Sequence, residues 1–215
     1  MRYVKNLTLI ALLAFVPSLA SAGDLGPLEP LADLHRAVRE SLGLPEPLIV
    51  RLLEQGAPDE HLPVIGLIAE RAHVSPEKVF DLHRGGLSWI DVSIRLGVGP
   101  EIFYVPIERD PGPPYGKAWG YYKKTPRSKW NTIRLSDREV VDLANLSLCV
   151  HRYGVSADDV VALRRNGEGF AQIHGQLAHG GKSNAPGQAD KGKPGKGSKK
   201  DKGKGKEKGK GHGAA

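Results

Sequence analysis

Residues 73–89 have the sequence HVSPEKVFDLHRGGLSW, and residues 154–170, which lie 81 positions later, have the sequence GVSADDVVALRRNGEGF. The two stretches align without a gap and keep apolar residues at equivalent positions. Identical residues at this offset include Val74/Val155, Ser75/Ser156, Val79/Val160, Leu82/Leu163, Arg84/Arg165 and Gly86/Gly167. An ungapped match of this kind indicates an internal repeat.

Each copy carries the signals of two short helices separated by a glycine turn. Ser75 and Ser156 stand at N-cap positions, and acidic residues follow in the first turn, where the helix dipole favours them. Gly86 and Gly167 are placed to end the first helix. Soon after each glycine, apolar residues recur at helical spacing and predict a second helix.

Two weaker copies of this pattern flank the first copy. One, at 43–56, precedes it, and the other, at 97–103, follows it. The sequence therefore predicts a mainly α fold of short helices in helix-turn-helix-like repeats. We expect helical repeats over 23–103 and 135–180. Between them, residues 104–134 are rich in Pro, Gly and aromatic residues, and this interlude is predicted to be irregular.

The first 22 residues predict a cleaved export signal. Arg2 and Lys5 precede an apolar run over 7–16, and small residues at 20–22 form a site that signal peptidase accepts. The run is about half the roughly 20 residues that span a bilayer. We therefore expect cleavage between Ala22 and Gly23, a mature chain without a transmembrane span, and a periplasmic or secreted location.

A helix-turn-helix pattern also raises the question of DNA reading. A DNA-reading helix exposes base-seeking side chains and phosphate-binding cations. The segment PEKVFDLHR at 76–84 instead balances two acids against two cations, and ADDVVALRR at 157–165 begins with two acids. The body between signal and tail carries a net charge of −3, which phosphates repel. Together with the export signal, these features argue against specific DNA reading.

The interlude is the stretch most typical of a binding site. It interleaves aromatic rings with cations, a combination that suits sugar rings, unstacked bases or acidic peptides. The alternative is that the rings pack at the junction of the two helical segments, and both descriptions can hold in part. The candidate binding residues are Tyr115, Lys117, Trp119, Tyr121, Tyr122, Lys123, Lys124, Arg127, Lys129 and Trp130.

The C-terminal segment 181–215 consists almost entirely of Gly, Lys and small polar residues, with a net charge of +8. It lacks the apolar side chains that offset the entropy of folding, so we expect a disordered tail. The tail either attaches to an anionic partner through its cations or only increases solubility. The lysines concerned are Lys191, Lys193, Lys196, Lys199, Lys200, Lys202, Lys204, Lys206, Lys208 and Lys210.

Catalytic, metal and cofactor sites have no recognisable pattern in the chain. The only cysteine, Cys149, lies in the apolar stretch LSLCV and is expected to be a buried small side chain. The eight histidines lack metal-ligand spacing. The segment HGGKS at 179–183 has Gln176 where a phosphate-binding loop has its first glycine. The sequence therefore predicts no catalytic residue, no metal ligand and no cofactor.

The helical repeats, the segment PPYGKAWGYYKK and the Gly/Lys-rich end together resemble small exported bacterial proteins of uncharacterised function, over about residues 60–215. The resemblance implies an envelope or secreted location and transfers no site residue. The favoured function is non-catalytic binding or scaffolding in the cell envelope, with an anionic envelope component or a protein as partner. The alternatives are a nucleic-acid or polyanion binder that uses tail and interlude, and an envelope enzyme acting on wall polymers.

Overall fold

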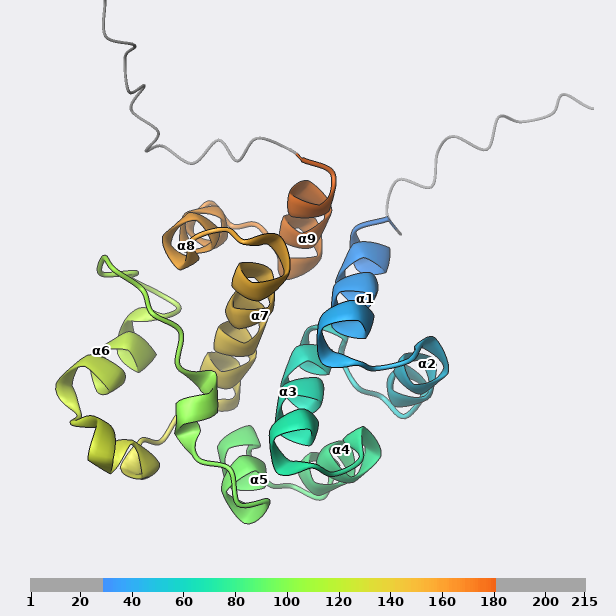
Figure 1. Cartoon of the computed structure of the whole chain (residues 1–215), viewed down its shortest axis with the longest axis horizontal. Helices are drawn as coiled ribbons and strands as arrows, with labels where there is room; N and C mark the ends of the chain where they lie inside the picture. Colours follow the sequence, from blue (N-terminus) through green and yellow to red (C-terminus); the bar gives the residue numbers. More distant parts are fainter. Residues whose placement is uncertain (1–28, 181–215) are drawn as a thin grey trace, which may run out of the picture. The chain divides into compact units, whose positions relative to one another are not determined.

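The computed structural model describes residues 29–180, which are helical and contain no strand. The predictions of a signal peptide (1–22) and of a disordered tail (181–215) concern residues outside this range. Four helices pack together at its centre in Figure 1, namely α1 (Glu29–Leu42), α3 (Leu62–Ala72), α7 (Asp137–Tyr153) and α9 (Phe170–Ala178). The prediction of a mainly α fold is confirmed.

Shorter helices cover the outside of this central group. Helix α2 (Glu46–Glu54) follows α1, α4 (Pro76–Arg84) follows α3, and α8 (Ala157–Arg165) follows α7 (Figure 1). Helix α5 (Trp89–Arg95) contacts both α3 and α7 and takes an inner position. The described part therefore alternates inner and outer helices.

The 81-residue repeat is visible residue by residue. Helices α4 and α8 begin and end at equivalent positions, and in both the N-cap serine accepts a hydrogen bond from the third main-chain N–H of the helix. Before them, His73 (φ 53°) and Gly154 (φ 66°) both end the inner helix in the left-handed conformation. The next helices begin with Trp89 and Phe170, which are both fully buried. The predicted helix starts and stops are confirmed.

A shorter offset of thirty residues relates the first two pairs of helices. Adding thirty to the bounds of α2 gives those of α4, and adding thirty to α1 gives the range of the short 3-10 helix η1 (Asp59–His61) together with α3. The third outer position, at 97–103, holds only the 3-10 helix η2 (Pro100–Phe103). The weak sequence copies are therefore real structural copies, and the third one is shortened.

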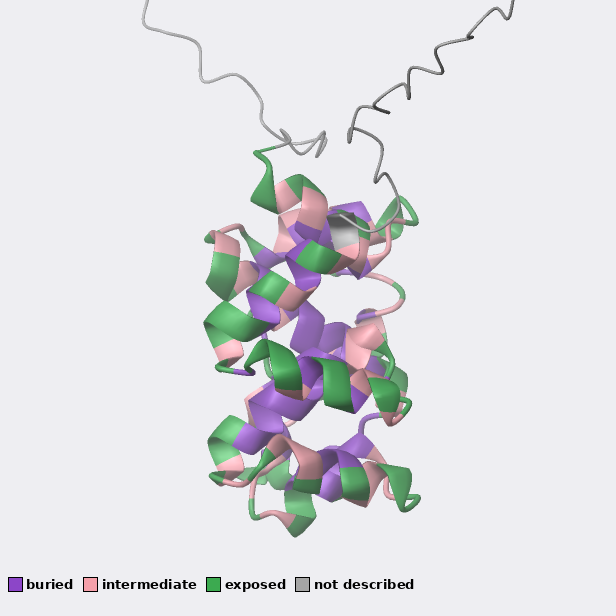
Figure 2. Cartoon of the chain, turned by 90° about the vertical axis from the view of Figure 1, so that its right-hand side faces the viewer, coloured by how far each residue is buried: buried purple, intermediate pink, exposed green. Residues whose placement is uncertain are grey.

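The first and last described helices pack against each other, so the segments on either side of the interlude form one compact unit. The imidazole of His179, just after α9, lies 2.9 Å from the carboxylate of Asp33 on α1. Arg152 of α7 pairs with Glu40 of α1. Figure 2 shows that the buried residues (purple) lie on the inward sides of the helices, while the outer turns are exposed.

The interlude differs from its predicted irregular form, because it contains helix α6 (Gly116–Lys124) and the 3-10 helix η3 (Arg127–Thr132). Tyr115, Ala118 and Tyr122 are spaced i, i+3 and i+7 and are all buried. This apolar face stabilises α6 in a sequence whose Gly and Pro content predicts a loop. Insertion of the interlude between η2 and α7 interrupts the alternation of inner and outer helices.

Candidate functional site

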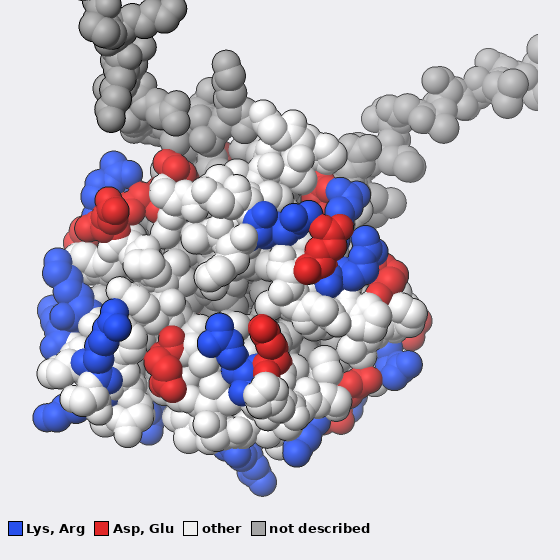
Figure 3. Space-filling view, in the orientation of Figure 1, with Lys and Arg blue, Asp and Glu red and all other residues white. Residues whose placement is uncertain are grey.

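The most unusual surface of the described part belongs to the interlude. No Asp or Glu occurs over residues 111–136. Six exposed cations in this range, here called the basic surface, form no ion pair with a carboxylate of the described residues. They are Lys117, Lys123, Lys124, Arg127, Lys129 and Arg134. In Figure 3, Lys and Arg side chains gather at the left edge, where α6 lies.

Most arginines elsewhere in residues 29–180 are neutralised by a nearby carboxylate. The paired ones are Arg36, Arg39, Arg51, Arg84, Arg109, Arg138, Arg152 and Arg164. On the helix of the helix-turn-helix-like unit, α4, Arg84 is held by Asp81 at 2.6 Å and Glu77 is held by Arg51 at 3.2 Å. The concentration of unpaired cations on the interlude therefore departs from the pattern of the repeats around it.

Three of the predicted binding residues are buried and anchor the interlude. The Tyr122 hydroxyl donates to the main-chain carbonyl of Pro100 at 2.6 Å, and Trp130 Nε1 donates to that of Thr125 at 2.9 Å. Their rings pack with centroids 5.0 Å apart. Tyr115 is buried next to Asp142 of α7, and burial raises the pKa of its phenol. Packing therefore explains these three aromatic residues.

The other predicted residues reach the surface, and cations lie over several of the rings. The Lys123 ammonium is 4.1 Å from the centroid of the Trp119 ring, and that of Lys117 is 5.8 Å from the Tyr121 ring. The Arg127 guanidinium lies 5.3 Å from the buried Trp130 ring. Lys124 and Lys129 are exposed without such a contact. The structure thus brings the predicted aromatic and cationic residues together, with packed rings beneath charged ends.

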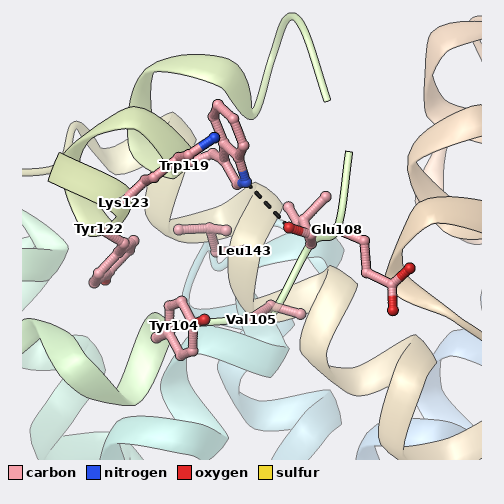
Figure 4. A pocket seen from close by; sticks show the side chains of 8 residues that line it. Tyr104, Val105, Glu108, Trp119, Tyr122, Lys123 and Leu143 are labelled. Carbon is pink, nitrogen blue, oxygen red and sulfur yellow. Dashed lines mark hydrogen bonds between the residues drawn. The ribbon is translucent and has the colours of Figure 1, made fainter. Parts of the chain in front are cut away.

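A hollow of about 230 Å³ opens beside the basic surface, between the interlude and α7. Trp119 forms one wall and is fixed there because its Nε1 donates to the carbonyl of Ile107 at 3.1 Å. Figure 4 shows Leu143 of α7 beneath it and the carboxylate of Glu108 pointing away. The lining residues are Tyr104, Val105, Ile107, Glu108, Trp119, Tyr122, Lys123 and Leu143.

Several lining residues were not among the predicted site residues. Leu143 lies in α7, and no local pattern links it to the interlude. Glu108 and Arg109 are held because their main-chain N–H groups donate to the Asp158 carboxylate, at 3.1 and 3.2 Å. Desolvation is the largest single effect on the pKa of Asp158, and it raises the pKa. The two main-chain bonds and the Arg109 side chain together outweigh it, so the pKa of Asp158 is lowered. Such contacts across 50 residues leave no signal in the sequence.

A second group of polar side chains lies between α7 and α9. Cys149 is fully buried, and burial raises the pKa of its thiol to about 12, so it is protonated at neutral pH. The Cys149 sulfur is 3.6 Å from His174 Nε2, and the Tyr153 hydroxyl is 2.9 Å from Nδ1 of the same ring. Burial lowers the pKa of His174 to about 4. A neutral thiol without solvent access is a structural group, as the apolar sequence around Cys149 predicts.

Comparison with known proteins finds no family model, no curated protein and no solved structure that matches the chain. Within residues 29–180, His, Cys, Asp and Glu side chains form no group of three or more that could hold a metal ion. In the same range, no helix has both the length and the apolar composition needed to cross a membrane.

Proposed function

We propose that this chain is an exported, non-catalytic binding protein that attaches to an anionic component of the cell envelope through the basic surface. The observation that carries this proposal is the acid-free run over 111–136, whose exposed cations form no ion pair with a carboxylate of the described residues. Cations that lie close together without carboxylates create a positive potential that attracts phosphate or carboxylate groups. The remaining repeats neutralise most of their arginines internally and serve as the scaffold.

The enclosed chemistry of the body supports binding rather than catalysis. The thiol of Cys149 is buried and protonated, and the hollow beside the basic surface is lined by a single carboxylate, that of Glu108. Enzymes that hydrolyse glycosidic bonds use two carboxyl groups on either side of the bond. The hollow therefore has the character of a receptor for part of a ligand.

Export is supported by the n-region, apolar run and small-residue site over residues 1–22. The experiment is to fractionate cells that express the full chain and to determine the N-terminus of the purified protein. We expect recovery outside the cytoplasm with Gly23 as the first residue. A cytoplasmic protein that retains Met1 would overturn this part of the proposal.

Binding is tested with two variants of the mature full chain that lose the same charge at different places. The first carries Lys117→Gln, Lys124→Gln, Arg127→Gln and Lys129→Gln, which remove cations of the basic surface. The matched control carries Arg71→Gln, Lys78→Gln, Arg95→Gln and Arg165→Gln, which remove exposed cations of the repeats that form no ion pair within residues 29–180.

Retention on a polyphosphate column is measured against salt, with a neutral dextran column as blank. We expect the first variant to bind at least tenfold more weakly, with a salt dependence reduced by roughly one unit of slope for each lost contact. The control should bind like the wild type. The tail is identical in all three proteins, so equal retention of both variants would assign the binding elsewhere and refute the proposal.

A further inference from the structure

The interior of the hollow restricts which anionic component fits the basic surface. Its floor is formed by Val105, Tyr122 and Leu143, which are all buried and present mostly apolar surface. The indole N–H of Trp119 is already used in a hydrogen bond within the protein, to the carbonyl of Ile107. A hydroxyl-rich sugar ring placed on this floor would lose hydrogen bonds with water that the floor does not replace. An apolar group placed there has no hydrogen bond with water to lose.

The rim of the same hollow carries the opposite chemistry. The Lys123 ammonium lies beside Trp119, and Arg127 lies 5.9 Å from the ring of Tyr104, another lining residue. Glu108 directs its carboxylate away from the hollow (Figure 4). The floor of the hollow is therefore mostly apolar and its rim is cationic, which is complementary to an anionic group attached to a hydrocarbon chain.

The exposed residues of the interlude have the composition of a membrane-interface surface. Tyr104 lines the hollow and is 36% exposed, and Tyr121, which is on α6 but does not line the hollow, is 38% exposed. Tyr and Trp place an apolar ring and a polar end at the boundary between lipid and water, and lysine extends its ammonium over an apolar stem. A cluster of four to eight Lys or Arg residues attracts anionic lipid head groups.

From these observations we infer that the basic surface docks on anionic lipid, with the head group held by Lys123 and Arg127 and a segment of the acyl chain in the hollow. This inference rests on the proposed function and names the class of its ligand. The volume of about 230 Å³ is below the roughly 300–1,000 Å³ of sites for drug-sized ligands, so the hollow takes part of a chain rather than a whole lipid.

The experiment uses the mature full chain and vesicles of phosphatidylglycerol mixed with phosphatidylcholine, in which the acyl chains of the anionic lipid carry bromine. Bromine quenches a tryptophan only on contact. Trp89 is fully buried and Trp130 nearly so, whereas Trp119 lines the hollow. We expect the vesicles to quench the wild-type fluorescence and to lose at least half of that quenching with Trp119→Phe. Binding without quenching would overturn the inference.

Two further arms separate this inference from the proposed function. Leu143→Phe fills the floor of the hollow and should weaken vesicle binding at least threefold more than it weakens polyphosphate binding. The four-residue variant of the basic surface should weaken both. If the chain binds polyphosphate and ignores phosphatidylglycerol vesicles, the lipid inference fails and the proposed function stands. If it binds neither, both fail.

Discussion

His83 and Arg164 occupy equivalent positions, 81 residues apart, and each donates a hydrogen bond to the main-chain carbonyl four residues further along. The distances are 2.8 Å from His83 Nδ1 to Leu87 O and 2.6 Å from Arg164 Nη1 to Glu168 O. Each group also covers the aromatic ring that begins the next helix. The centroids of the His83 and Trp89 rings are 3.7 Å apart, and Arg164 Cζ lies 4.3 Å from the centroid of the Phe170 ring. The two copies therefore close their turns with different chemistry in the same geometry.

The groups that face these two residues are also equivalent. Arg164 pairs with the carboxylate of Asp142 at 3.1 Å. The residue 81 positions before Asp142 is His61, whose ring centroid lies 5.8 Å from that of His83. The second copy thus encloses a pair of opposite charges. The first copy encloses two imidazoles that repel each other when both are protonated.

We predict that His61 makes the folded protein sensitive to acid. Burial lowers its pKa, His83 lowers it further, and Asp137 of α7 acts in the opposite direction. Since the folded pKa lies below the unfolded value of about 6.5, the unfolded chain binds more protons as the pH falls. The stabilisation from neutral His61 is therefore present above about pH 6.5 and is lost on acidification below it. It is measured as the urea midpoint between pH 7 and pH 4.

The comparison needs variants that remove one titrating group each. His61→Gln should show a smaller loss of stability between pH 7 and pH 4 than the wild type. His73→Asn is the control, because residue 73 is exposed and Asn tolerates the left-handed backbone there. His174, which also has a lowered pKa, remains in all three proteins and cancels in the differences. Equal pH profiles for His61→Gln and the control would contradict the prediction.

The left-handed residue that ends each inner helix gives a second, reciprocal prediction. His73 has φ 53°, and its equivalent Gly154 has φ 66° with no atom near the position of an added Cβ. A residue with a Cβ loses about 1 kcal/mol in this conformation relative to glycine. His73→Gly should therefore stabilise the protein by about 1 kcal/mol, and Gly154→His should destabilise it by a similar amount. Both are measured by urea unfolding, and changes of the same sign in the two variants would refute the equivalence.

Local signals explain why the repeat could be predicted from sequence. N-cap serines and helix-ending residues act within a few residues, so Ser75 and Ser156 mark α4 and α8 without tertiary information. Helix α6 was not predicted, because Gly116, Gly120 and the prolines before it are typical of a loop. The spacing of Tyr115, Ala118 and Tyr122 is the signal that would have identified it.

The candidate site was predictable only in its charge and aromatic content. Lys123 and Trp119 are four residues apart on α6, so their contact follows from helical geometry. Leu143 enters the hollow from another helix, and Asp158 fixes the backbone of Glu108 from the start of α8. Contacts of this kind depend on how the helices pack, which one sequence does not specify. The burial of Tyr115 against α7 has the same origin.

We predict that the Tyr122 hydroxyl is a main anchor of the interlude. Tyr122→Phe removes the donor and leaves the carbonyl of Pro100 buried without this hydrogen bond, which costs about 1–3 kcal/mol. Tyr121→Phe is the matched control, since Tyr121 is 38% exposed, and it should change stability by less than about 0.5 kcal/mol. Hydrogen exchange over 104–134 should accelerate only in the first variant. Similar exchange in both variants would show that the bond contributes little.

The pair of Asp142 and Arg164 joins the interlude to the repeats, because Tyr115 is buried against it. Burial raises the pKa of Asp142, and Arg164 opposes this rise. Arg164→Met leaves the buried carboxylate without its closest partner and should cost about 3–5 kcal/mol at pH 7, whereas Asp142→Leu combined with Arg164→Met should restore most of it. In the single variant the pKa of Asp142 in the folded state rises further above its unfolded value. The loss of stability relative to the wild type should therefore shrink as the pH falls toward 4 and Asp142 becomes protonated. Urea unfolding of the wild type and both variants at pH 7 and pH 4 measures each difference. A deficit independent of pH would mean that Arg164 stabilises the fold through its contacts with Phe170 and the Glu168 carbonyl rather than through charge.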